Sequence, residues 1–168
     1  MTMHGGAGGL SGAQLARELM QQGFDFFTGV PCSLVASLIT ALEPHGYIAE
    51  TREDAALGLA AGAAPAGRRP VVVMQNSGFG VSLNALGSLQ AIYEMPCLLV
   101  ITWRGYEGKD APEHLVMGEA MPKILDAMSI PWRAIEATSA ADDVAWARAR
   151  LDGKPGPVAL VVKPGVLA

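Results

Sequence analysis

Side chains able to do chemistry are concentrated in four short segments of a chain that is otherwise poor in charge. Charged residues make up 17% of the 168 residues, whereas hydrophobic residues make up 51%. The segments offer a carboxylate, an amide, a hydroxyl, a guanidinium, an amine and an imidazole, and each follows an apolar run that predicts a buried strand. They are residues 28–33, 51–54, 75–80 and 103–114. Their concentration favours catalysis or ligand binding.

Alternating helices and strands must position these segments. Hydrophobic periodicity, a capping box of the S-x-x-Q type and the Gly and Pro breaks predict helices at 11–22, 34–42, 54–64, 80–91, 114–128 and 140–151. Strands are predicted at 24–29, 47–50, 70–75, 97–103 and 158–162. This order predicts one α/β domain over residues 11–168, a doubly wound parallel sheet with helices on both faces, after a flexible tail at residues 1–10. In such folds ligands bind outside the carboxyl ends of the strands, so the four segments should share one edge.

Composition argues against several classes of protein. A net charge of −4 without a basic cluster offers nucleic acid no binding surface. No apolar run reaches the ~20 residues of a membrane span, so we assign the hydrophobic excess to a subunit interface in an oligomer. The first nine residues lack the pattern of a secretory signal, and we expect a cytoplasmic protein. Cys32 and Cys97 match no metal or disulfide spacing; we predict no metal site and a buried Cys97.

Five motifs occur in a specific order along the chain: FFTGVPCS, EDAALGLAAG, VVVMQNSGFG, ITWRG and GKDAPEH. In this order they resemble the pyrimidine-binding domain of thiamine-diphosphate-dependent decarboxylases, in the sulfopyruvate and phosphonopyruvate decarboxylase family. The resemblance covers nearly the whole chain, and in chain organisation it is greater to the sulfopyruvate-type alpha subunits. It implies that this chain forms part of an enzyme that removes CO2 from a 2-oxo acid.

Glu53 is the principal candidate for a catalytic residue. The resemblance implies that its carboxylate bonds to the cofactor's aminopyrimidine ring and thereby activates the thiazolium carbon. The alternative is a first-turn helix glutamate that interacts with the helix dipole, because Thr51 and Asp54 also fit a cap at this place. The helix that follows is rich in alanine and contains two glycines, which favours close packing against another helix at an interface.

Residues 76–79 are the second candidate site. The glycines around Phe79 suggest a dinucleotide fingerprint, but the third glycine and the later acidic residue are missing. The resemblance instead implies that Asn76, Ser77, Gly78 and Phe79 line the pyrimidine pocket, with the two polar side chains bonding to the ring and Phe79 packing on its apolar face. For Ser77, a polar turn that caps the next helix remains an alternative.

Arg104, Lys109 and His114 lie in a glycine-containing segment that we expect to be mobile. Arg104 and Lys109 are suited to bind the anionic head of a small 2-oxo acid, and the resemblance implies that His114 is an active-site histidine. The alternatives are solvated loop charges and a helix-start residue. Cys32 stands where phosphonopyruvate decarboxylases carry an aspartate, which favours sulfopyruvate as the substrate; a small apolar pocket residue is its plainer interpretation.

The chain lacks one half of a complete site. Enzymes of this family bind Mg2+ and the diphosphate through a Gly-Asp-Gly motif and a later asparagine, and this sequence has no such pattern. We therefore expect a separate beta subunit to bind the metal and the diphosphate of thiamine diphosphate, with the active site between the chains. The alternatives are a subunit that acts on another 2-oxo acid and a non-catalytic α/β binding module.

Overall fold

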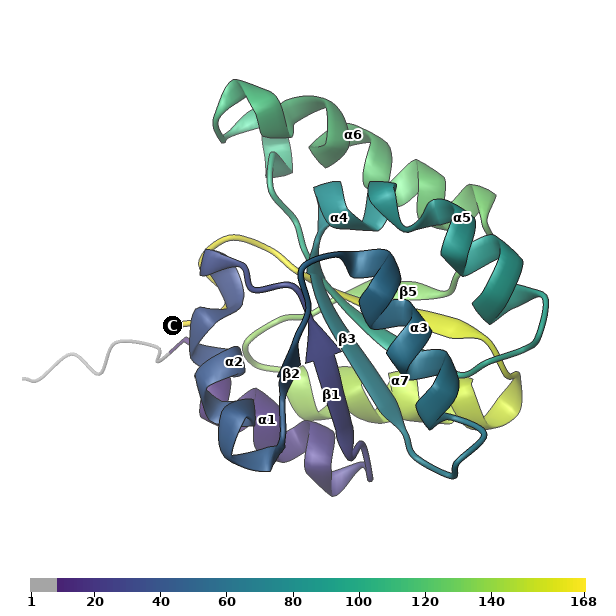
Figure 1. The fold of residues 1–168 in the computed structure, drawn as a ribbon. Helices are drawn as coiled ribbons and strands as arrows, with labels where there is room; N and C mark the ends of the chain where they lie inside the picture. Colours follow the sequence, from purple (N-terminus) through teal and green to yellow (C-terminus); the bar gives the residue numbers. More distant parts are fainter. Residues whose placement is uncertain (1–8) are drawn as a thin grey trace, which may run out of the picture.

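The computed structural model describes residues 9–168, and its centre is a six-stranded sheet in which every neighbouring pair is parallel (Figure 1). The strand order is β2-β1-β3-β4-β6-β5. The predicted doubly wound parallel sheet is therefore confirmed. The strands are β1 (Phe26–Gly29), β2 (Ile48–Ala49), β3 (Pro70–Gln75), β4 (Cys97–Thr102), β5 (Trp132–Ala134) and β6 (Pro157–Val162).

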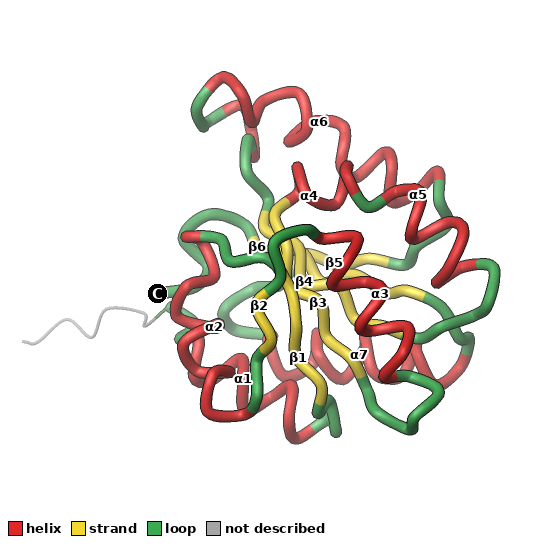
Figure 2. Tube along the Cα trace, in the orientation of Figure 1, coloured by secondary structure: helices red, strands yellow, loops and turns green. Residues whose placement is uncertain are grey.

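Helices cover both faces of the sheet (Figures 1 and 2). One face packs against α1 (Gly12–Gln21), α2 (Ala36–Leu42) and α7 (Ala140–Gly153). The other packs against α3 (Glu53–Ala63), α4 (Asn76–Val81), α5 (Leu83–Ala85), the π-helix η3 (Leu86–Ala91) and α6 (Pro112–Ala127). Three short 3-10 turns complete the order: η1 (Ser33–Val35), η2 (Glu43–His45) and η4 (Tyr106–Gly108).

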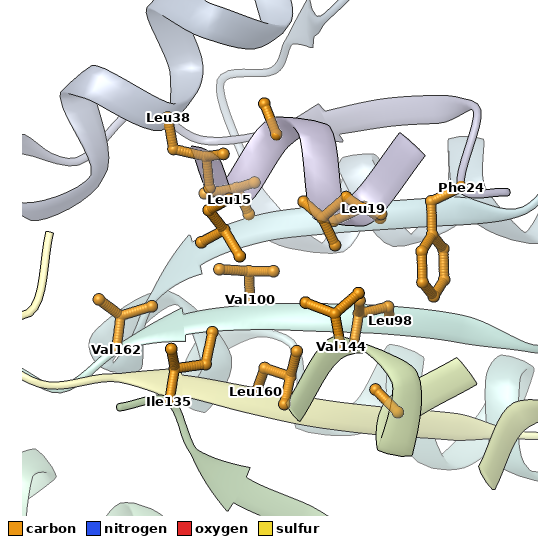
Figure 3. Close-up of a cluster of buried hydrophobic side chains, with 14 of the residues drawn as sticks. Leu15, Leu19, Phe24, Leu38, Leu98, Val100, Ile135, Val144, Leu160 and Val162 are labelled. Carbon is orange, nitrogen blue, oxygen red and sulfur yellow. The ribbon is translucent and has the colours of Figure 1, made fainter. Parts of the chain in front are cut away.

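The strand side chains alternate between two hydrophobic cores. In β3, Val71 and Val73 face the α1 and α7 side, whereas Val72 and Met74 face the α3 and α6 side. Figure 3 shows the first core, where Leu19 and its neighbours on α1 meet strand side chains of β4 and β6. Because both faces of the sheet are buried, its central strands are continuous apolar runs, which is why the sequence pattern located them.

The first helix begins as the capping box predicts. The Gln14 backbone N–H donates to the Ser11 hydroxyl at 3.2 Å, and the Gln14 side chain accepts from the Ser11 N–H at 2.9 Å. Gly23, at φ +80°, follows the helix as its stop signal. Gly12 allows α1 to approach α2 closely, since a Cβ there would lie 2.1 Å from the Ser37 carbonyl carbon.

The structure corrects the sequence-based prediction of elements in three places. Helical structure after β3 starts at Asn76, not at Gly80, so residues 76–79 lie in α4 and not in a loop. The predicted 80–91 helix is divided into the end of α4, α5 and η3. The sheet also contains a short edge strand beside β6, β5, which the sequence pattern did not predict.

The predicted tail at residues 1–10 falls mostly outside the described residues. Leu10, its last residue, is buried and forms a parallel bridge with Leu167, so it belongs to the core. Within residues 9–168, no helix combines the length and the apolar character that crossing a membrane requires.

Candidate functional site

The topology locates the site at the carboxyl ends of β1 and β3. The helix after β1, α2, covers one face of the sheet, whereas the helix after β3, α4, covers the other. The connections therefore diverge between these neighbouring strands, which is the switch point where ligands bind in open α/β sheets. Gly29 lets the two strand ends approach closely here, since a Cβ at its position would lie 2.0 Å from the Val73 carbonyl oxygen.

Glu53 is the first residue of α3, and its side chain lies across the backbone of α4. A Cβ at Gly78 would be 2.0 Å from Glu53 Oε1 and 2.2 Å from its Cδ, so only glycine leaves room for this carboxylate. Within residues 9–168 the Glu53 carboxylate has no hydrogen-bond or ion-pair partner among the contacts of the structure. It thus lies beside α4 with its bonding capacity unused.

Asp54 fills the helix-start role that the sequence left open for Glu53. Its carboxylate accepts from Arg52 Nε at 3.0 Å and Nη2 at 2.8 Å, and also from the Ala55 N–H at 2.9 Å. The hydrogen bonds from Arg52 hold the pKa of Asp54 below its usual range. Neither Thr51 nor Asp54 is the N-cap, because that position is Arg52 and its side chain makes no capping bond.

Asn76 is fully buried at the end of β3, and only half of its amide is satisfied. Its Nδ2 donates to the Arg104 carbonyl at 2.8 Å, whereas its Oδ1 has no partner in the described structure. A buried acceptor without a partner costs about 1–3 kcal/mol. A ligand N–H at this oxygen would remove that cost, which makes Asn76 a candidate binding residue on its geometry alone.

Ser77 and Phe79 differ in their suitability for ligand binding. Ser77 is exposed, and its hydroxyl accepts a hydrogen bond from Gln75 Nε2 at 2.7 Å. Phe79 is completely buried in the core beneath α4, with Leu86 and Met121 in the same cluster. The structure therefore gives Phe79 a core position in place of the predicted pocket position. The reason is that Phe79 lies within α4, on the side of the helix that packs on the sheet.

The segment after β4 is held tightly against α6. A Cβ at Gly105 would be 2.3 Å from the His114 carbonyl oxygen, and a Cβ at Gly118 would be 2.6 Å from the Gly105 carbonyl oxygen. Pro122 has no N–H to bond to Gly118 within the helix, and Trp103 Nε1 donates to the freed Gly118 carbonyl at 2.8 Å. These contacts place the half-buried His114, in the first turn of α6, directly beside the segment.

Arg104 and Lys109 are both ion-paired. Arg104 contacts the Asp110 carboxylate through Nε at 2.7 Å and Nη2 at 2.8 Å, and the two side chains are 22% and 12% exposed. Lys109 is 80% exposed and pairs with Glu107 at 2.9 Å. Arg104 thus belongs to the interior of the segment, whereas Lys109 lies on its outside. No role was predicted for Asp110 from the sequence, although it lies within the GKDAPEH motif, two residues before the N-terminal proline of α6.

Cys32 lies at the same sheet edge in mixed surroundings. Its sulfur is 3.6 Å from Gln75 Oε1 and 3.4 Å from Thr102 Oγ1, although part of the side chain packs against the first core. It is therefore not the purely apolar pocket residue of the plainer interpretation. Cys97 is buried in β4 as predicted, and burial raises the pKa of its thiol to about 12.

The chain is similar to a protein-family model and to known proteins. A family model described as thiamine pyrophosphate enzyme, N-terminal TPP binding domain, matches residues 11–130. The chain is 34% identical over 119 residues to sulfopyruvate decarboxylase subunit alpha of Methanococcus maripaludis, covering 69% of this chain and 71% of that protein. It is 34% identical over 165 residues to phosphonopyruvate decarboxylase of Streptomyces viridochromogenes, covering 95% of this chain but only 42% of that protein.

A solved structure with a similar fold is the 2-oxoglutarate:ferredoxin oxidoreductase from Magnetococcus marinus. Its TM-score is 0.72 at 14% sequence identity, and the match covers 94% of this chain and 29% of that one. At this identity the likeness establishes the fold alone.

Proposed function

This chain belongs to the thiamine pyrophosphate enzymes, through their N-terminal TPP-binding domain, and from that membership we propose that it is the alpha subunit of a two-subunit 2-oxo acid decarboxylase. The substrate that we assign is sulfopyruvate, which the complex would convert to sulfoacetaldehyde and CO2. The observation that carries the proposal is the similarity to a sulfopyruvate decarboxylase alpha subunit, 34% identical over 71% of its length.

Glu53, Asn76 and Gly78 supply what an aminopyrimidine ring requires. Thiamine diphosphate, when bound, supplies the electron sink that the loss of CO2 from a 2-oxo acid needs. The unpaired Glu53 carboxylate accepts an N–H from the ring and holds a proton at that nitrogen. The buried Asn76 Oδ1 accepts a second N–H, and Gly78 leaves the backbone of α4 open to the ring. Ser77 borders this surface, whereas Phe79 supports it from the core.

Arg104 and His114 face the substrate in this proposal. Asp110 accepts hydrogen bonds from the Nε side of the Arg104 guanidinium, so the N–H groups at the other edge of the guanidinium remain free for an anion. His114 supplies an imidazole for proton transfer or for a hydrogen bond to the substrate carbonyl. Lys109, on the outside of the segment, leaves Glu107 and contributes its positive charge to the bound substrate.

A separate beta subunit completes the site by binding Mg2+ and the diphosphate. Within residues 9–168 no group of three or more His, Cys, Asp and Glu side chains is placed to hold a metal ion. The helices around Glu53 carry exposed apolar side chains suited to a partner: Leu59 on α3 (37% exposed), Val81 on α4 (54%) and Val116 on α6 (77%). We place the partner over this layer of helices.

The test is reconstitution with a partner chain that carries the Gly-Asp-Gly motif. CO2 and aldehyde release are measured with sulfopyruvate, phosphonopyruvate and pyruvate. Phosphonopyruvate is the second candidate, because the similarity to a phosphonopyruvate decarboxylase extends over 95% of this chain. We expect the highest kcat/KM with sulfopyruvate, and a loss of several orders of magnitude in Glu53→Gln. Turnover by Glu53→Gln at the wild-type rate would remove Glu53 from the mechanism, and a complex inactive on every 2-oxo acid would refute the proposed function.

A further inference from the structure

We infer that Asp110 is a positioning residue of this site, which holds Arg104 by one edge so that the other edge receives the anionic head of the substrate. The same carboxylate fixes the segment that leads to His114. The substrate part of this inference rests on the proposed function, whereas the positioning part rests on contacts within the chain.

The Asp110 carboxylate accepts four hydrogen bonds. Two come from Arg104, through Nε at 2.7 Å and Nη2 at 2.8 Å, and two come from the backbone N–H groups of Gly105 at 2.9 Å and Ala111 at 2.8 Å. A carboxylate has about four acceptor sites, so none is left for a substrate. The bonds from Arg104 hold the pKa of Asp110 far below its usual range, and the group stays ionised at neutral pH. Asp110 therefore acts through its neighbours and not as an acid or a base.

This pairing decides which part of Arg104 faces a ligand. A guanidinium has five N–H groups in a planar fork, and the side-on bond to Asp110 uses the one on Nε and one on Nη2. Three remain, two on Nη1 and one on Nη2, and one N–H from each of these nitrogens lies along the end of the fork. That edge can donate two parallel hydrogen bonds to two oxygens of a sulfonate, phosphonate or carboxylate.

The backbone of the segment is fixed at the same time. Asn76 Nδ2 donates to the Arg104 carbonyl at 2.8 Å, and the His114 N–H donates to the Ala111 carbonyl at 2.9 Å. Asp110 is the only side chain among the described residues that bonds both to Arg104 and to the backbone on either side of the η4 turn. Its loss should therefore release the guanidinium and the segment together.

The pairing of charges in this segment favours recognition of the substrate by the direction of hydrogen bonds. Asp110 offsets the charge of Arg104, and Glu107 offsets that of Lys109, so the segment carries no excess positive charge at these pairs. Attraction by net charge is thus weak, and selection of a dianionic substrate depends on the direction of the free N–H groups.

The first arm of the test is kinetic and uses the complex. We expect Asp110→Asn to raise KM for sulfopyruvate by about 10- to 100-fold, because one charge-assisted contact is misplaced. The kcat/KM for pyruvate, which has no anionic head beyond its carboxylate, should change less than about 3-fold by the same argument. Arg104→Lys keeps the positive charge but loses the planar set of N–H donors, and it should likewise impair sulfopyruvate far more than pyruvate. Asp152→Asn is the control, because it removes an ion pair with Arg148 on α7, on the opposite face of the sheet, and it should leave the kinetic constants for both substrates unchanged.

The second arm uses the full chain alone and does not depend on activity. Amide hydrogen exchange of residues 103–111 should accelerate at least about 10-fold in Asp110→Asn, while the central strands keep their protection. If Asp110→Asn and Arg104→Lys lower kcat/KM equally for sulfopyruvate and pyruvate, the inferred orientation of Arg104 toward the anionic head is wrong. If amide exchange of residues 103–111 is unchanged in Asp110→Asn, Asp110 does not hold the segment. If the wild-type complex decarboxylates no 2-oxo acid, the proposed function fails, and the exchange arm still decides whether Asp110 positions this segment.

Discussion

Replacing Gly78 with alanine should disable the site without unfolding the chain. The added Cβ would lie 2.0 Å from Glu53 Oε1, whereas ordinary contacts start at 3.4 Å, so the carboxylate has to move away. A displacement of about 1 Å at a reacting group can cost about 100-fold in rate. We therefore expect kcat of the complex to fall by about 100-fold.

Folding should be unaffected or improved by the same substitution. Gly78 lies within α4, where alanine is favoured over glycine by up to about 1 kcal/mol. The atoms in its way belong to the end of a flexible side chain, so they move at little cost to the fold. The free energy of unfolding of the isolated chain, from urea titration, should stay within about 1 kcal/mol of the wild-type value or rise.

The assay for the site is hydrogen–deuterium exchange at the cofactor's thiazolium carbon in the complex, with kcat as the second measurement. The matched control is Gly87→Ala, a helical position where an added Cβ meets nothing within 4 Å. In a Glu53→Gln background, Gly78→Ala should add almost no further loss, because the two changes act on one carboxylate. A wild-type exchange rate in Gly78→Ala would refute the reasoning, as would a stability loss of more than about 2 kcal/mol, which would make Gly78 a packing residue.

Three further outcomes are expected. Neutralising Arg104 and Lys109 together should lower kcat/KM for sulfopyruvate about 10- to 100-fold more than for pyruvate; equal losses would assign the segment to closure or assembly. Gly58→Ala on the open face of α3, where an added Cβ meets nothing within 4 Å, should stabilise the isolated chain by about 1 kcal/mol yet weaken its assembly with the partner in sedimentation experiments. Unimpaired assembly would move the interface away from α3. Ser129→Gly should raise the free energy of unfolding by about 0.5–1 kcal/mol, because Ser129 has φ +54° immediately after Met128, the C-cap of α6, and glycine adopts this conformation without strain. A lower free energy of unfolding than that of the wild type in urea titration would contradict this.

The sequence contained enough information for the fold and for part of the site. The central strands were located within a residue or two, because a parallel strand buried on both faces is a continuous apolar run. The capping box that starts α1 and the stop at Gly23 are equally local signals. Glu53 was placed at the start of a helix after a strand, and its assignment to the cofactor came from the resemblance.

The tertiary structure decided what those residues contact, since hydrophobic periodicity and capping signals act over a few neighbours along the chain. Only the packing of α3 on α4 brings Glu53 against Gly78, 25 positions later, and only the fold closes Asn76 onto the Arg104 carbonyl. A pattern of residue types does not say which of the carboxylates of Glu107, Asp110 and Glu113 pairs with Arg104. The path of the backbone around η4 selects Asp110. The buried position of Phe79 is also decided by the tertiary structure. The chain passes directly from β3 into α4, and Phe79 lies on the side of that helix that packs on the sheet.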